Sequence, residues 1–207
     1  MIDLFSLFEL TTIATFFGAC VVLYLTPGAD MMFISASGAA GGPRFGVAAA
    51  LGVSLGSYVH VILAAIGVAA LIQAHPAAYY ALRYVGAAYL AWLAIGAWRA
   101  GDQLSQAMGA TDLRRAFLRG WLTNALNPKV SLFVLAFLPQ FADPERGPVW
   151  VQILVLGAIF SLGSIPFNMG YGAAAGLVST WLRRSARLMN RLCAAVFGGL
   201  AARLVLG

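Results

Sequence analysis

Two charged residues lie inside long apolar stretches of this chain, and each comes shortly after a proline. Asp30 follows Thr26–Gly28, which contains Pro27, and Lys129 directly follows Asn127–Pro128. Ionisable side chains at such depth usually face protein or a water-filled cavity. Asp30 could bind an ammonium group or carry a coupling proton, and Lys129 could hold a carboxylate. The sequence therefore predicts a site for a solute that carries both groups, with a static Asp30–Lys129 salt bridge as the alternative.

Hydroxyl and amide side chains accompany both charges. His60 is a further ionisable residue in an apolar segment; a buried core role is its first interpretation, and proton coupling its second. Asn168 lies just after Pro166 and could line the same cavity. The predicted substrate-binding or coupling residues are Thr26, Pro27, Gly28, Asp30, Thr123, Asn124, Asn127, Pro128, Lys129 and Asn168.

The prolines predict where helices are interrupted. Thr26 and Asn127 are good N-cap residues directly before a proline, a pattern that starts a new half-helix. A proline also frees the carbonyl four residues back, here Leu23 and Asn124. The unpaired N–H groups and positive dipole of each new helix start would suit a carboxylate. Two kinks that merely fit the packing are the alternative.

The composition shows what surrounds these residues. The 207-residue chain is 61% hydrophobic and 10% charged, with a mean hydropathy of +0.86, which indicates an integral membrane protein. About 20 apolar residues cross a hydrocarbon core as a helix. Neither cysteine, Cys20 or Cys193, has the spacing of a metal site or a disulfide framework. Six transmembrane helices are predicted near 9–37, 43–72, 77–99, 119–141, 148–177 and 187–206.

Arginine placement predicts the orientation. The net charge of +6 comes from arginines at helix ends and connections, not from a nucleic-acid-binding surface. Nine of them follow helices 1, 3 and 5, which places that side in the cytoplasm and both termini outside it. The N-terminus shows no clear removable signal peptide, so helix 1 is expected to stay. The nine are Arg44, Arg99, Arg114, Arg115, Arg119, Arg183, Arg184, Arg187 and Arg191.

An internal repeat relates the two interrupted helices. The tetrapeptide SLGS occurs at 54–57 and again at 161–164, an offset of 107, and the segment 86–94 resembles 193–201 at the same offset. With three helices each, the second half enters the membrane from the opposite side. The predicted fold is an all-α polytopic membrane protein, one transporter domain (1–207) of two inverted three-helix repeats (about 9–99 and 119–206), with helices 1 and 4 broken mid-membrane. Close helix packing is expected at Gly42, Gly46, Gly52 and Gly56.

Two long motifs resemble a known family. "YLTPGADMMFISASGAAGGPRFGVAAALGVSLGSYVH" and "FLRGWLTNALNPKVSLFVLAFLPQF" are similar to the LysE/RhtB family of bacterial amino-acid exporters. The resemblance implies a multi-pass secondary transporter of the bacterial cytoplasmic (inner) membrane that exports amino acids or close derivatives in exchange for protons. Ala29 stands where the family usually has a second proline. The matching positions are Pro27, Gly28, Asp30, Asn124, Asn127, Pro128 and Lys129.

Other functions remain open at this level. A metal-ion exporter of similar architecture would need several converging ligands, and Asp30 is the only acid deep in a predicted helix. A membrane thiol–disulfide electron carrier would need paired cysteines. No phosphate-binding loop is present, so export is expected to use an ion gradient or to run downhill. The predicted partners are an amino acid, a proton and the lipid bilayer, without nucleic acid, metal or cofactor and without enzymatic activity; a homodimer is one open assembly.

Overall fold

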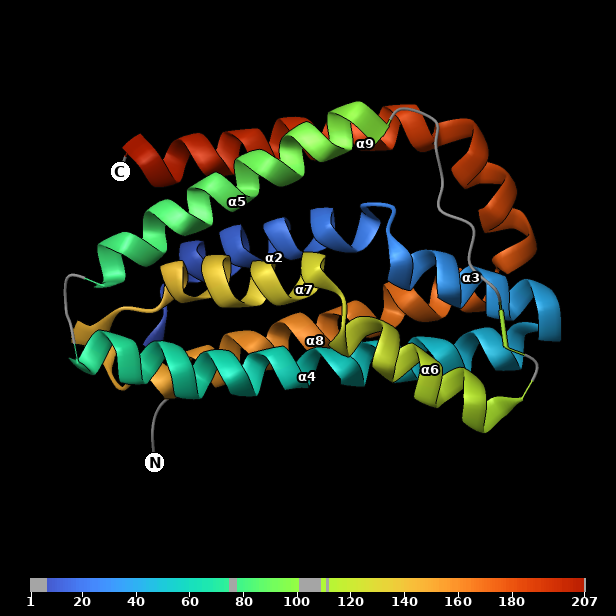
Figure 1. The fold of residues 1–207 in the computed structure, drawn as a ribbon, viewed down its shortest axis with the longest axis horizontal. Coiled ribbons are helices and arrows are strands. Elements are labelled where there is room, and N and C mark those ends of the chain that lie inside the picture. Colours follow the sequence, from blue (N-terminus) through green and yellow to red (C-terminus); the bar gives the residue numbers. More distant parts are fainter. Residues whose placement is uncertain (1–6, 75–77, 101–108, 111, 207) are drawn as a thin grey trace.

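Helices form all the regular structure in the described part of the chain. The computed structural model describes residues 7–74, 78–100, 109–110 and 112–206. Most helices lie along one long axis, with the first residues of α2 and the last residues of α9 toward the same end (Figure 1). The helices are α2 (Leu10–Leu25), α3 (Ala29–Gly41), α4 (Pro43–Ala74), α5 (Ala78–Ala100), α6 (Leu113–Ala125), α7 (Pro128–Leu132), α8 (Val149–Ala173) and α9 (Ala175–Leu206).

Both predicted interruptions are present. Helices α2 and α3 bend by 53° at Thr26–Gly28, and α6 bends by 48° relative to the helical segment Pro128–Phe141. Ala29 is the first residue of α3, so the break forms without a second proline. Beyond α7 the chain tightens from a π-helical turn, Phe133–Phe137, to a 3₁₀ turn, Leu138–Phe141. The expected helices 9–37 and 119–141 are therefore bent pairs, as predicted.

The predicted connection between the last two helices is wrong. Residues 178–186 are predicted to lie between two membrane helices, but α8 ends at Ala173 and α9 begins at Ala175 and continues for 32 residues. No glycine or proline occurs between Leu177 and Phe197, and arginine, leucine and alanine are good helix formers. The basic residues of this segment therefore mark charge on a continuous helix rather than a loop.

Some of these helices meet the length and composition of a membrane crossing. Pro43–Gly67 and Val149–Ala173 do so individually, and each bent pair does so when its two parts are taken together. Helices α5 and α9 are not in this set among the described residues. The structure thus gives two to four candidate crossings in the described part of the chain, and six crossings remain a prediction.

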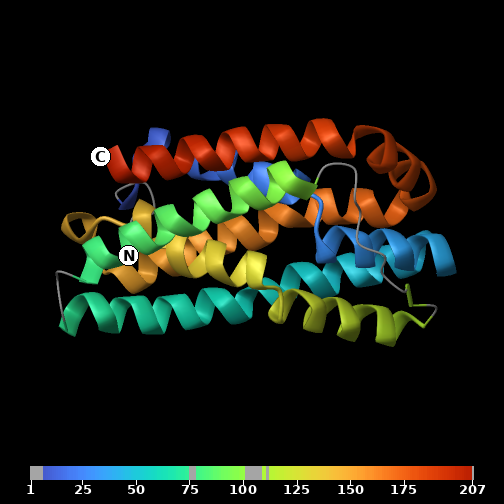
Figure 2. The same cartoon turned by 45° about the horizontal axis from the view of Figure 1, so that its top comes forward.

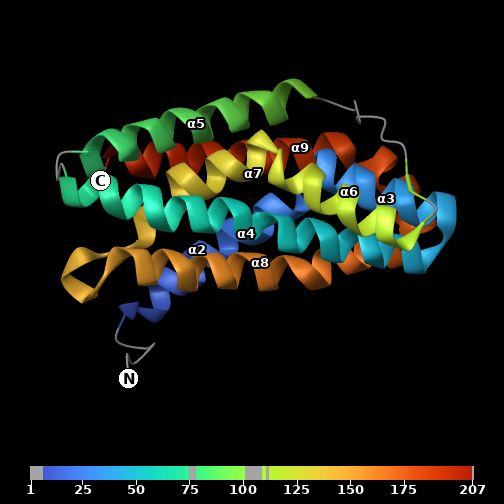
Figure 3. The same cartoon turned by 60° about the horizontal axis from the view of Figure 1, so that its bottom comes forward.

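Three helix pairings organise the interior. Helix α4 packs against both α6 and α8, and α5 packs along α9, as Figures 2 and 3 show from two directions. The larger apolar cluster is filled by phenylalanine side chains from helices of both halves, including the fully buried Phe16, Phe133, Phe137 and Phe197. These contacts bring the two breaks into the middle of the molecule.

Glycines allow α4 to approach its neighbours closely. A Cβ atom at Gly52 would collide with the Phe117 carbonyl oxygen of α6, and one at Gly46 with Gly172 of α8. A Cβ at Gly56 would lie 2.6 Å from the Trp121 carbonyl oxygen. The predicted packing role is confirmed at these three glycines.

Gly42 was predicted wrongly as a fourth packing position. A Cβ there would have no atom within 4 Å, and the residue has φ of +94° at the end of α3. Its N–H donates to the Gly38 carbonyl. Gly42 therefore terminates α3, since this left-handed conformation favours glycine.

Gly52→Ala is expected to lower the melting temperature of the detergent-solubilised protein. The new methyl group meets rigid backbone, and overpacking of this kind costs about 1–3 kcal/mol of unfolding free energy. Gly67→Ala on the same helix is the control, since a Cβ there has no neighbour within 4 Å. Alanine also favours a helix over glycine by about 1 kcal/mol, so Gly67→Ala should be neutral or stabilising. Equal melting of the two variants would show that α4 and α6 are less close than described.

Candidate functional site

A small polar cavity lies between the two breaks. Its volume is about 40 Å³, and side chains from α2, α3, α4, α6, α7 and α8 or their breaks enclose it. Seven of the ten predicted site residues line it. The lining residues are Leu23, Tyr24, Thr26, Gly28, Asp30, Met31, Val53, Ser57, Asn124, Asn127, Lys129, Val130, Phe160, Ser164 and Asn168.

The other three predicted residues have different places. Pro27 and Pro128 form the breaks but do not line the cavity. The Thr123 hydroxyl donates to the Arg119 carbonyl at 2.7 Å, one turn back on α6. This local bond satisfies the hydroxyl within its own helix, so Thr123 lies near the site without lining it.

The two breaks are capped differently. Asn127 is the N-cap of α7, since its Oδ1 accepts from the Lys129 N–H at 3.0 Å, as predicted. Thr26 is not the N-cap of α3; Gly28 occupies that position, so this prediction is wrong. The Thr26 hydroxyl instead donates backward to the Val22 carbonyl at 2.6 Å, a bond that competes with N-capping.

Lys129 crosses from the second break to the first. Its Nζ donates to the Thr26 carbonyl at 2.8 Å and lies 3.4 Å from the Leu23 carbonyl, the group that Pro27 frees. Asp30 and Lys129 both belong to the described residues, and the structure has no ion pair between them, so the alternative of a static salt bridge is not observed. Lys129 is also the only lysine of the chain. It closes the end of α2, a role that the sequence reasoning missed.

Asp30 is held by an amide and keeps one oxygen without a partner. The Asn124 Nδ2 donates to Asp30 Oδ2 at 2.8 Å. Within the described residues, Asp30 Oδ1 and Asn124 Oδ1 are buried and have no hydrogen-bond partner. A buried acceptor without a donor is costly. Two such acceptors beside a polar cavity suit a ligand rich in N–H donors.

His60 lies behind Asn124. The side chain is 4% exposed, and its Nε2 is 3.0 Å from the Asn124 carbonyl oxygen. Since a carbonyl only accepts, Nε2 is the donor in this bond. This arrangement matches the first interpretation, a buried histidine with a satisfied bond.

The repeated SLGS segments belong to α4 and α8, which lie side by side in Figure 3, and they contact each other. Ser57 and Ser161 share a hydrogen bond of 2.7 Å, and Ser164 donates to Ser54 at 3.0 Å. The Asn168 amide also donates to Ser54 at 3.0 Å, which fixes its direction at the cavity wall. Sequence reasoning used SLGS only as evidence for a repeat; the paired hydroxyls in an apolar segment were the available signal for a contact.

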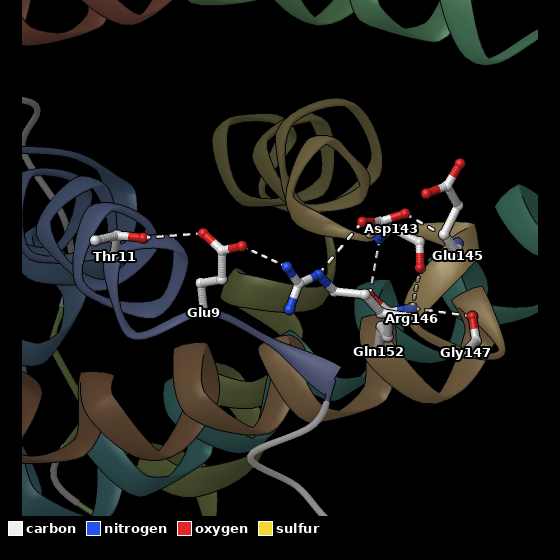
Figure 4. A network of polar contacts seen from close by, with 7 residues as sticks. All are labelled: Glu9, Thr11, Asp143, Glu145, Arg146, Gly147 and Gln152. Atoms are coloured by element: carbon white, nitrogen blue, oxygen red, sulfur yellow. Dashed lines mark hydrogen bonds and ion pairs between the residues drawn. The ribbon is translucent and has the colours of Figure 1, made fainter.

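A second polar network lies at the end of the molecule that holds the start of α2 (Figure 4). Arg146 pairs with Glu9, the residue before α2, and its Nε lies 3.4 Å from Asp143 Oδ2. The fully buried Gln152 accepts from the Asp143 N–H at 2.9 Å and donates to the Asp143 carbonyl at 2.7 Å. The connection before α8 is thereby fixed to the first helix.

A helical chain of this apolar composition, with two broken helices around a polar cavity, has the architecture of a membrane transporter. The chain belongs to the LysE family: residues 21–207 match the family described as LysE type translocator. It is therefore a transporter and not an enzyme. No solved structure matches the chain.

Relatives of similar length cover most of the chain. An uncharacterized membrane protein of Vibrio cholerae is 33% identical over 183 residues, which are 86% of this chain and 89% of the relative. A leucine efflux protein of Klebsiella pneumoniae is 32% identical over 209 residues, 97% of this chain and 98% of the relative. A homoserine/homoserine lactone efflux protein of Salmonella typhimurium is 29% identical over 180 residues, 85% of this chain and 87% of the relative.

Proposed function

We propose that this transporter exports amino acids or close derivatives across the bacterial cytoplasmic membrane in exchange for protons. The observation that carries the proposal is the pair of buried acceptors, Asp30 Oδ1 and Asn124 Oδ1, at the cavity between the two breaks. An α-ammonium group has three N–H donors and a positive charge, which match these acceptors. The leucine and homoserine efflux proteins among the relatives support the same solute class.

The other end of an amino acid also finds a partner in this arrangement. Lys129 Nζ has three hydrogens, and the bonds to Leu23 and Thr26 use two of them. The third hydrogen is available for a carboxylate, and the positive end of α7 begins beside it. Lys129 thus serves as the anion-binding group, and Asp30 as the cation-binding and proton-coupling group.

The cavity must enlarge to admit such a solute. A water molecule needs about 10–15 Å³ of cavity volume, so 40 Å³ holds a few waters and not a leucine. The two bends and the π-helical turn Phe133–Phe137 are places where helices can change direction without losing many backbone bonds. Opening at these breaks would load the site from one side and release from the other.

Six crossings in two inverted repeats fit this cycle. The SLGS copies of α4 and α8 bond to each other, as segments related by a two-fold axis would. The arginine distribution supports an orientation with both termini outside the cytoplasm. Reporter fusions at the two termini test this orientation, and cytoplasmic reporter activity at either end would contradict it.

The function is tested with purified protein in proteoliposomes loaded with each amino acid in turn. Leucine and homoserine should leave faster than from protein-free liposomes, and an imposed proton gradient should drive their movement against a concentration gradient. Failure of every amino acid and amino-acid lactone in the panel would overturn the proposal. Transport at a rate independent of the proton gradient would show that export runs down the concentration gradient of the solute, without proton coupling.

A further inference from the structure

We propose that His60 is a positioning residue of the transport site, which acts through Asn124 on Asp30. Its imidazole holds the Asn124 carbonyl, and the Asn124 amide in turn holds Asp30 Oδ2 at 2.8 Å. The meaning of this chain of bonds for transport rests on the function proposed above. The bonds themselves are contacts of the folded protein.

The position of His60 follows from the packing of α4 on α6. Along α4, Gly52 faces the Phe117 carbonyl and Gly56, one turn later, faces the Trp121 carbonyl. His60, a further turn on, faces the Asn124 carbonyl. One row of α4 residues at intervals of four therefore meets successive backbone oxygens of α6.

A side-chain donor from α4 is needed opposite the Asn124 carbonyl, but not opposite the carbonyls of Phe117 and Trp121. The carbonyls of Phe117 and Trp121 lie inside α6, where an N–H four residues ahead can bond them. The residue four ahead of Asn124 is Pro128, which has no N–H. The Asn127 N–H makes a tight-turn bond to this oxygen at 2.9 Å, and the imidazole completes its second acceptor position. The glycines of α4 therefore lie opposite the intact part of α6, and His60 lies opposite the end of α6.

The first break has a matching arrangement. The carbonyl that Pro27 frees belongs to Leu23, and its side-chain donor is Lys129 from the other half of the chain. The carbonyl that Pro128 frees is bonded by His60, again from the other half. Each broken helix end is thus closed by a basic side chain of the opposite half. Lys129 lines the cavity, whereas the lining residues do not include His60, so the hydrogen bonds that link His60 to the site run through Asn124.

Three substitutions separate positioning from proton transfer. In His60→Gln the amide nitrogen replaces Nε2 at similar reach and cannot titrate. In His60→Asn the amide nitrogen matches Nδ1 instead and falls short of the carbonyl. His60→Leu keeps the bulk and removes every donor. All three are compared by melting temperature in detergent and by leucine and homoserine transport at several pH values.

Positioning predicts a graded result. His60→Leu and His60→Asn should lower transport roughly tenfold or more, since the Asn124 carbonyl then keeps only the bond from the Asn127 N–H and Asn124 is held less firmly beside Asp30. His60→Gln should recover most of the transport, with the pH profile of the unsubstituted protein. A His60→Gln variant as inactive as His60→Leu, or one with a shifted pH profile, would overturn the proposal. Full transport by a folded His60→Leu variant would overturn it as well.

A second measurement does not depend on transport. The chain has two histidines, His60 and His75, so a His75→Gln background leaves one imidazole for ¹⁵N NMR. The expected spectrum has a hydrogen on Nε2 that exchanges slowly with solvent, because the ring is buried and this nitrogen donates to a carbonyl. An imidazole with hydrogen on Nδ1 alone would overturn the assignment. If no amino acid is transported but the Nε2 signal is present, the proposed function fails while the positioning bond stands.

Discussion

Asp30→Asn is expected to reduce proton-driven export to the level of protein-free liposomes while the protein still folds. The substitution keeps the size of the side chain and an oxygen that can accept from Asn124, but it removes the charge and the titratable proton. Hydrogen bonds to charged groups contribute about 1.5–3 kcal/mol, so ammonium binding should weaken roughly 10- to 150-fold. Exchange of solute without a gradient should persist at raised solute concentration.

Asp112→Asn is the matched control for this experiment. Asp112 is the exposed N-cap of α6, and its side chain accepts from the Arg115 N–H at 2.8 Å. Asparagine caps a helix about as well as aspartate, so this variant should transport normally. The role of Asp30 is disproved if Asp30→Asn moves leucine against its gradient as well as Asp112→Asn does.

Lys129→Met is expected to impair both folding stability and transport. Methionine approximates the length of the side chain without its donors, so the Thr26 carbonyl loses its 2.8 Å bond and the Leu23 carbonyl its weaker one. The Leu23 carbonyl still accepts from the Thr26 N–H at 3.2 Å, so the Thr26 carbonyl is the one left without a donor, which costs about 1–3 kcal/mol. The melting temperature in detergent should therefore fall by several degrees, and transport should fall at least tenfold.

A comparison with Lys129→Gln separates the structural role from the charge. Glutamine keeps an N–H donor, so part of the lost stability should return, while transport should stay low because the anion-binding charge is missing. Wild-type melting and transport in Lys129→Met would show that Lys129 neither closes α2 nor binds the solute.

The positions of the breaks could be predicted because their cause is local. A proline removes one backbone N–H whatever surrounds it, so Pro27 and Pro128 marked both interruptions. Six of the polar or break residues beside them line one cavity together with Asn168 of α8, because the breaks pack together. The continuous helix across 178–186 was missed because arginines were taken as a sign of a loop, although their helix propensity is high.

The bonding partners could not be predicted, since they depend on contacts between distant segments. The Thr26 side chain could form either of two hydrogen bonds, one as N-cap of the following helix and one back to the Val22 carbonyl. The local sequence does not decide between them. The bond from Lys129 to the end of α2 spans 106 residues, and that from His60 to Asn124 spans 64. Such bonds follow from the distances between helices, which the sequence pattern does not contain.

The serine contact between α4 and α8 has a mechanical consequence. At the repeat offset of 107, Ser57 corresponds to Ser164 and Ser161 to Ser54, so exchanging the halves turns the Ser57–Ser161 bond into the Ser164–Ser54 bond. For two halves that swap shapes during a cycle, such a pair has the same total energy in the inward-open and outward-open forms. In the proposed export cycle, the serine contact would therefore stabilise both forms equally. The bonds of Lys129 and His60 join residues that are not equivalent in this way, so in the proposed cycle they would differ between the two forms.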